Sequence, residues 1–125
     1  MRRVAASVHG RVAALLLVVG IAACAGPDPG ALPRVVDDYE VAPYGVLQDC
    51  VRLAAGDRLD YRFESSETVQ FAIQYHQAGA VLAPIVREGT RGDGAVFAAT
   101  DAREYCLVWE AGAAGARLQY HFSVR

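Results

Sequence analysis

Any fold for this chain has to bury one apolar run, Tyr105-Cys106-Leu107-Val108-Trp109-Glu110, which contains the only tryptophan. The run has the length and the β-branched and aromatic content of a strand, and turn-forming residues flank it on both sides. A helix would need at least about ten residues. A buried strand requires a sheet around it, so the rest of the chain should supply several more strands.

The first 23 residues have the pattern of a secretory signal. Arginines at positions 2, 3 and 11 accompany an apolar block at residues 12–23, which at about 12 residues is too short to span a bilayer well. The block ends in Ile21-Ala22-Ala23-Cys24, which resembles the lipobox of bacterial lipoproteins, where the cysteine is lipidated and becomes the new N-terminus. We therefore expect a lipoprotein signal peptide at 1–23 and a lipid anchor on Cys24. An ordinary signal peptide is the alternative.

Cleavage before Cys24 would leave residues 24–125, enough for one domain with one core. Residues 24–34 are rich in proline and glycine and are expected to form the lipidated N-terminus and a flexible tether. Residues 35–125 are expected to form the domain. The segment after the signal carries nine arginines and fourteen acidic residues. Its net charge of −5 disfavours nucleic acid as a partner.

Short apolar segments alternate with turn residues from residue 35 onward. The segments that have the length of a strand are 35–41, 47–53, 57–63, 69–76, 80–86, 95–99, 105–109 and 117–124. Polar and apolar residues alternate most clearly in 57–63, 69–76 and 118–124. Turn formers such as Ser65-Ser66-Glu67 and Gly92-Asp93-Gly94 separate the segments. The pattern predicts an all-β chain, an antiparallel β-sandwich that is jelly-roll-like and has about eight strands.

Two cysteines, Cys50 and Cys106, remain once Cys24 carries lipid. An exported protein matures in an oxidising compartment, so we expect these two to form a disulfide. Two buried free thiols are the alternative. A metal pair is not favoured, because neither cysteine lies in a C-x-x-C spacing.

The segments 57–65, 69–73, 105–110 and 118–124 resemble, in order, those of the GOLD (Golgi dynamics) domain. That family is a β-sandwich used for protein or lipid interaction, and its cargo-receptor members pair cysteines placed as Cys50 and Cys106 are here. The resemblance implies a binding module and gives no support for vesicle traffic. The chain departs from the family at Glu110-Ala111, where an acidic residue and asparagine are usual. A similarity to the small β-sandwiches appended to secreted bacterial peptidases accounts for the same strand pattern.

The residues capable of catalysis or metal binding form no recognisable motif. His76 and His121 fall on the polar faces of predicted strands and could share a metal if those strands were neighbours. No third ligand lies at a suitable spacing, so we predict no metal site and no cofactor. The serines after the signal lack a nucleophile-elbow motif, so we predict that the protein is not an enzyme. Arg91-Gly92-Asp93 matches an integrin-type tripeptide, but the turn chemistry of its glycine and aspartate already explains it.

The sequence thus predicts a lipid-anchored protein of the bacterial cell envelope, in the outer membrane facing the periplasm where there are two membranes. It is expected to be a non-catalytic module that binds an envelope protein or ligand. A structural or assembly-accessory lipoprotein and a small hydrolase are the alternatives. Partner contacts are expected on a polar loop at 87–94, from Arg87, Glu88, Arg91 and Asp93. A mobile hairpin tip without function is one alternative, and the polar face bearing Gln74, His76 and His121 is the other.

The lipid anchor can be tested directly. Replacing Cys24→Ser removes the thiol to which lipid is attached, so the variant should leave the membrane fraction and appear in the soluble fraction. Fractionation followed by immunoblotting measures the distribution. Equal partitioning of the variant and the parent protein would show that Cys24 is not the anchor.

Overall fold

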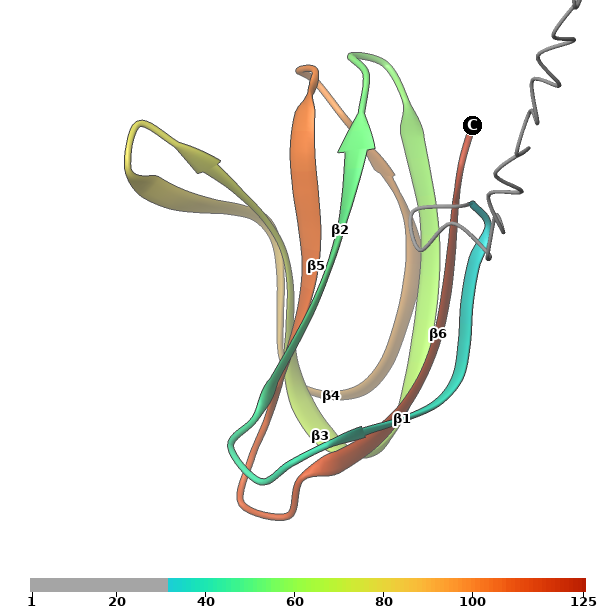
Figure 1. The fold of residues 1–125 in the computed structure, drawn as a ribbon, viewed down its shortest axis with the longest axis vertical. Helices are drawn as coiled ribbons and strands as arrows, with labels where there is room; N and C mark the ends of the chain where they lie inside the picture. Colours follow the sequence, from blue (N-terminus) through green and yellow to red (C-terminus); the bar gives the residue numbers. More distant parts are fainter. Residues whose placement is uncertain (1–31) are drawn as a thin grey trace, which may run out of the picture.

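The computed structural model describes residues 32–125, which form an antiparallel all-β fold (Figure 1). Its strands are β1 (Arg34–Val41), β2 (Val46–Leu53), β3 (Arg58–Gln77), β4 (Ala80–Ala98), β5 (Arg103–Ala111) and β6 (Ala116–Val124). The predicted fold class is confirmed. The signal peptide, Cys24 and most of the tether lie outside the described residues. Within residues 32–125, no helix has the length and hydropathy needed to cross a bilayer.

The long β3–β4 hairpin belongs to two layers of sheet. Residues 59–65 of β3 pair with β6, residues 69–74 of β3 pair with β5, and β4 accompanies β3 along both halves. β1 then pairs with β6, and β2 with β5. We call the half with β1 and β6 the β6 layer, and the half with β2 and β5 the β5 layer. Figure 1 shows the hairpin curving through a U, so that its two halves lie in different layers.

Six strands are present where about eight were expected, because two predicted turns do not reverse the chain. The expected strands 57–63 and 69–76 are the two halves of β3, and 80–86 and 95–99 both belong to β4. Ser65-Ser66-Glu67 lies in a shift of register where β3 bends from one layer to the other. Because the partner strand continues past this point, the polar residues form an irregularity within the strand and do not end it.

Trp109 lies at the centre of the core, only 1% exposed. Its ring lies 5.8 Å and 4.6 Å from those of Phe63 and Tyr120 in the β6 layer, and 5.4 Å from that of Phe71 in the β5 layer. Aromatic pairs at such distances add about 0.5–1.5 kcal/mol each beyond the area they bury. The run 105–110 therefore lies in a buried strand, as predicted, and its tryptophan joins the two layers.

Cys50 of β2 and Cys106 of β5 are direct cross-strand partners and form a disulfide. The predicted bridge is confirmed. The two residues are separated by 56 positions in the sequence. In the chain-entropy model, closing a loop of this length lowers the entropy of the unfolded chain and so stabilises the fold by about 4 kcal/mol. It attaches the edge strand β2 to its neighbour β5.

Candidate binding groove

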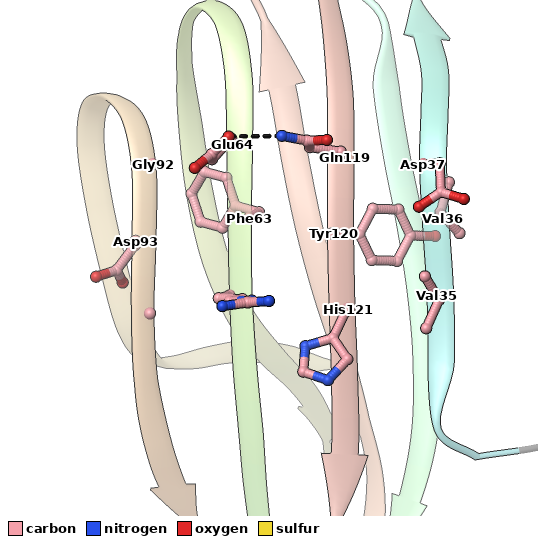
Figure 2. Close-up of a pocket in the computed structure, with 12 residues that line it drawn as sticks. Val35, Val36, Asp37, Phe63, Glu64, Gly92, Asp93, Gln119, Tyr120 and His121 are labelled. Atoms are coloured by element: carbon pink, nitrogen blue, oxygen red, sulfur yellow. Dashed lines mark hydrogen bonds between the residues drawn. The ribbon is translucent and has the colours of Figure 1, made fainter.

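A groove of about 530 Å³ crosses the outer face of the β6 layer. β3 and β6 form its floor, and β1 and β4 form its sides (Figure 2). Alternate residues of β3 and β6 fill the core, so the side chains that they turn toward the groove are polar. The side chains and glycines that shape the groove are Val35, Asp37, Arg62, Glu64, Gly92, Gly94, Gln119 and His121.

The strand register arranges these residues in two rows across the sheet. In the first row, Arg62 of β3 lies between His121 of β6 and Gly94 of β4, and His121 is also paired with Val35 of β1. We call this the basic row. It combines a guanidinium and an imidazole, with a glycine that leaves space on one side of the arginine.

In the second row, Glu64 of β3 lies between Gln119 of β6 and Gly92 of β4. Asp37 of β1 also lines this part of the groove (Figure 2). We call these residues the acidic row. Residues two apart in a strand are separated by about 7 Å, so the two rows lie about that far apart. The groove thus has a basic end and an acidic end.

Within residues 32–125, the acidic row of the groove contains a hydrogen bond, whereas two groups of the basic row have no partner. Gln119 donates a hydrogen bond from Nε2 to Glu64 (Figure 2). Arg62, in contrast, has no carboxylate within ion-pair distance among residues 32–125. The Nδ1 atom of His121 is shielded from solvent and has no hydrogen-bond partner in the same described range.

The glycines of β4 leave one side of the groove without side chains. A Cβ atom at Gly92 would lie 3.1 Å from the carbonyl oxygen of Phe63, and one at Gly94 would lie 3.2 Å from Cβ of Arg62. Either contact is tighter than normal packing, so a larger side chain would crowd the neighbouring strand β3. The groove therefore borders bare backbone on its β4 side.

A second hollow, of about 320 Å³, extends the groove along the same face. It shares Asp37, Glu64 and Gln119 with the first hollow and adds Asp38 and Arg117. Arg117 is already paired with Asp38 at 3.1 Å. The surface is therefore elongated, and its acidic part lies in the region common to both hollows.

The inner side of the same layer carries a cluster of ionisable residues. Tyr61 donates a hydrogen bond to Asp93 at 3.0 Å, and Arg87 lies 3.4 Å from the same carboxylate. Burial raises the pKa of Tyr61 to about 12, and the hydrogen bond to Asp93 and its charge act in the same direction. This cluster lies on β3 and β4, where the hairpin passes between the layers.

A second cluster of the same composition lies at the opposite edge of the sandwich. Tyr120 of β6 donates a hydrogen bond to Asp49 of β2 at 2.7 Å, and Arg34 of β1 pairs with the same carboxylate. Burial raises the pKa of Tyr120, and the hydrogen bond to Asp49 adds to the effect. The contacts join the two edge strands β1 and β2, so they hold the layers together on that side.

The four residues predicted to contact a partner lie in strand β4 and not on a loop. That structural prediction is wrong, because β4 stays paired with β3 on both sides of a shift in register. Arg87 and Asp93 take part in the inner cluster. Glu88 and Arg91 are exposed, and Arg91 lies 3.6 Å from Glu67. A binding role for these residues stays a prediction.

The alternative polar face does not exist as one surface. His121 lies on the outer face of the β6 layer, whereas Gln74 and His76 lie in the part of β3 that belongs to the β5 layer. The histidines therefore cannot share a metal ion. Within residues 32–125, the one group with metal-ligand spacing is Cys50, Glu104 and Cys106, and its two cysteines are joined in the disulfide.

The sequence pattern identified the outward-facing positions of β3 and β6 but not the groove. Arg62 and Gln119 alternate with core residues in segments that were correctly predicted as strands. Their proximity depends on the pairing of residues 59–65 with β6, which a local pattern does not reveal.

Comparisons with known proteins support the fold. No family model and no curated protein matches the chain, so the resemblance to the GOLD domain stays a prediction. Among solved structures, the chain is similar to PliG of Aeromonas hydrophila, a periplasmic inhibitor of g-type lysozyme. The TM-score is 0.60 at 15% identity, over 78% of this chain and 90% of that one.

Two further structures have the same kind of fold. One is the pre-peptidase C-terminal domain of a collagenase from Bacillus anthracis, with a TM-score of 0.55 at 13% identity over 75% of this chain and 90% of that one. The other is TmCBM61 in complex with β-1,4-galactotriose, with a TM-score of 0.51 at 15% identity over 79% and 76% of the two chains. The chain is thus a small β-sandwich like those of bacterial inhibitor and carbohydrate-binding proteins, and the similarity to a peptidase-appended sandwich holds for the fold.

The inner cluster predicts a specific alkaline sensitivity. The pKa of Tyr61 is about 12 in the folded protein and about 10 in an unfolded chain. Its protonated form therefore stabilises the fold fully below pH 10, and this contribution is lost as the pH rises toward 12. In Tyr61→Phe, the fall in the free energy of unfolding between pH 9 and pH 11.5 should be smaller by about 2 kcal/mol. Urea denaturation of residues 25–125 at each pH measures the free energy of unfolding. If this free energy fell equally with pH in the variant and the parent protein, the raised pKa of Tyr61 would be contradicted.

Proposed function

We propose that this protein is a lipid-anchored, non-catalytic binding protein of a bacterial envelope, which holds a protein partner in the groove of the β6 layer. The observation that carries the proposal is an elongated polar groove whose basic row has no carboxylate partner among residues 32–125. Polar groups that converge in a concave surface are the usual mark of a binding site.

Two independent features support a location outside the cytoplasm. The Cys50–Cys106 disulfide is typical of proteins that fold in an oxidising compartment. The N-terminal sequence has the charged, apolar and small-residue regions of an exported lipoprotein. An alanine follows Cys24, so sorting to the outer membrane is expected where the organism has two membranes.

A binding role is favoured over catalysis by the chemistry of the groove. Among residues 32–125, no serine or cysteine lines the larger hollow. The two serines of the smaller hollow, Ser65 and Ser66, form hydrogen bonds with the backbone of Glu67 and Arg117 and have no base beside them in these bonds. Of the carboxylates that line the larger hollow, Asp37 and Glu64 are exposed on an open sheet face, where no described residue excludes water from a reacting bond. The disulfide removes both cysteines of the domain from nucleophilic chemistry.

A protein partner is favoured over a glycan by the orientation of the aromatic residues. Phe63 and Tyr120 contribute to the groove, but the two residues are only 3% and 7% exposed because their side chains face the core. A sugar ring would therefore find no exposed aromatic surface among the described residues of the groove. Of the structural neighbours, PliG inhibits a protein and TmCBM61 binds a sugar. The exposed arginine and carboxylates of the groove suit charge complementarity with a protein partner.

Filling the groove tests this function. Gln119→Trp places a large side chain in the region common to both hollows, and it should reduce capture of the partner from envelope extracts by residues 25–125 at least tenfold. Gln70→Trp is the matched control, since Gln70 is also exposed but belongs to the β5 layer. Both changes are on strand surfaces, so folding midpoints should change little.

Quantitative mass spectrometry of the captured proteins measures the effect. Equal loss with both variants would mean that the groove is not the site. Capture that β-1,4-galactotriose abolishes would contradict a protein partner and indicate a glycan-binding module.

A further inference from the structure

We propose that the basic row recognises a carboxylate, supplied by an acidic side chain in an extended segment of the protein partner, and that Arg62 is the residue that binds it. This inference rests on the proposed function, because it names the chemistry that the groove selects.

The availability of Arg62 sets it apart from most arginines of the domain. Six of the nine arginines in residues 32–125 form ion pairs. Arg52, Arg58 and Arg62 form none in this range, and of these only Arg62 lines the groove. Its charge is therefore available to a ligand.

The acidic neighbours of Arg62 on the same face of β3 already have partners. Asp60 lies 3.3 Å from Arg125, and Glu64 accepts a hydrogen bond from Gln119. Asp93, on the neighbouring strand, points to the other side of the sheet and binds Tyr61. An external carboxylate would meet little competition from these groups for the guanidinium.

The surroundings of Arg62 suit a carboxylate in both shape and chemistry. A guanidinium presents two parallel donors that match the two oxygens of a carboxylate. Gly94 leaves the side of the arginine toward β4 without a side chain, and His121 on the other side brings a second nitrogen-bearing group. The groove extends over both hollows, and this elongated shape suits an extended peptide.

The acidic row adds a preference for a basic residue two positions away from the acidic residue of the ligand. Asp37 and Glu64 lie about 7 Å from the basic row, which is the spacing between residues i and i+2 of an extended peptide. A segment with an acidic residue at one position and a basic residue two positions away therefore complements both rows. The expected ligand is a mixed-charge peptide of this kind.

Two short peptides test the inference with the soluble domain, residues 25–125. Acetyl-Glu-Ala-Lys-amide carries the required carboxylate, and acetyl-Gln-Ala-Lys-amide is its isosteric neutral control. Titrations followed by amide chemical shifts should show the Glu peptide binding at least fivefold more tightly, with the largest shifts in residues 62–64 and 119–121. Equal affinities for the two peptides would overturn the proposal.

Variants of two arginines on the same face of β3 test whether Arg62 is responsible for the preference for the Glu peptide. Arg62→Gln should remove the preference for the Glu peptide, and Arg62→Lys should retain part of it. Arg58→Gln should keep the full preference, because Arg58 is also exposed and without an ion pair in the described range but does not line the groove. A preference that survives in Arg62→Gln would overturn the assignment, as would tighter binding of trigalacturonate than of the Glu peptide.

The same variants separate this inference from the proposed function. If Gln119→Trp abolishes capture of the partner while Arg62→Gln captures it normally, the groove is the binding site but carboxylate recognition is wrong. If Arg62→Gln weakens capture at least fivefold and Arg58→Gln does not, both proposals are supported.

Discussion

The β3–β4 hairpin takes part in both layers of the sandwich, and the other strands are arranged around this constraint. Once β3 bends between Glu64 and Val69, β6 can pair only with its first half and β5 only with its second. The inner faces of the two layers then meet around Trp109. The outer face of the β6 layer acquires the glycines of β4 beside the polar residues of β3 and β6, and so the groove follows from the same bend.

The polar clusters inside the sandwich complement this arrangement. Each consists of an arginine, an aspartate and a tyrosine, and one lies at each lateral edge of the two layers. Hydrogen bonds to a charged group contribute about 1.5–3 kcal/mol each when they are well formed. Arg34 and Arg87 thereby hold the layers together, so the recognition that we propose would use an arginine on an outer face. Of the outer arginines that line the two hollows, Arg117 is paired with Asp38, whereas Arg62 has no ion pair among residues 32–125.

Much of this structure was predictable from local pattern. Alternating residues identified the strands that build the core, and two cysteines in an exported chain predicted the disulfide. The pattern could not tell that Ser65-Ser66-Glu67 bends a strand without ending it, because similar residues form turns, and the outcome depends on whether β4 keeps pairing beyond them. The same limit hid the groove, since the pairing of Arg62 with His121 is a contact between strands distant in sequence.

Site-specific photo-crosslinking tests the central claim, that the groove of the β6 layer holds the partner. Val35 and Val46 are both 58% exposed and lie on the edge strands of different layers, but only Val35 lines the groove. With p-benzoylphenylalanine at either position of the full-length protein in cells, irradiation should produce one defined crosslinked protein from position 35 and none from position 46. A crosslink from position 46 with none from position 35 would contradict the account and assign recognition to the β5 layer.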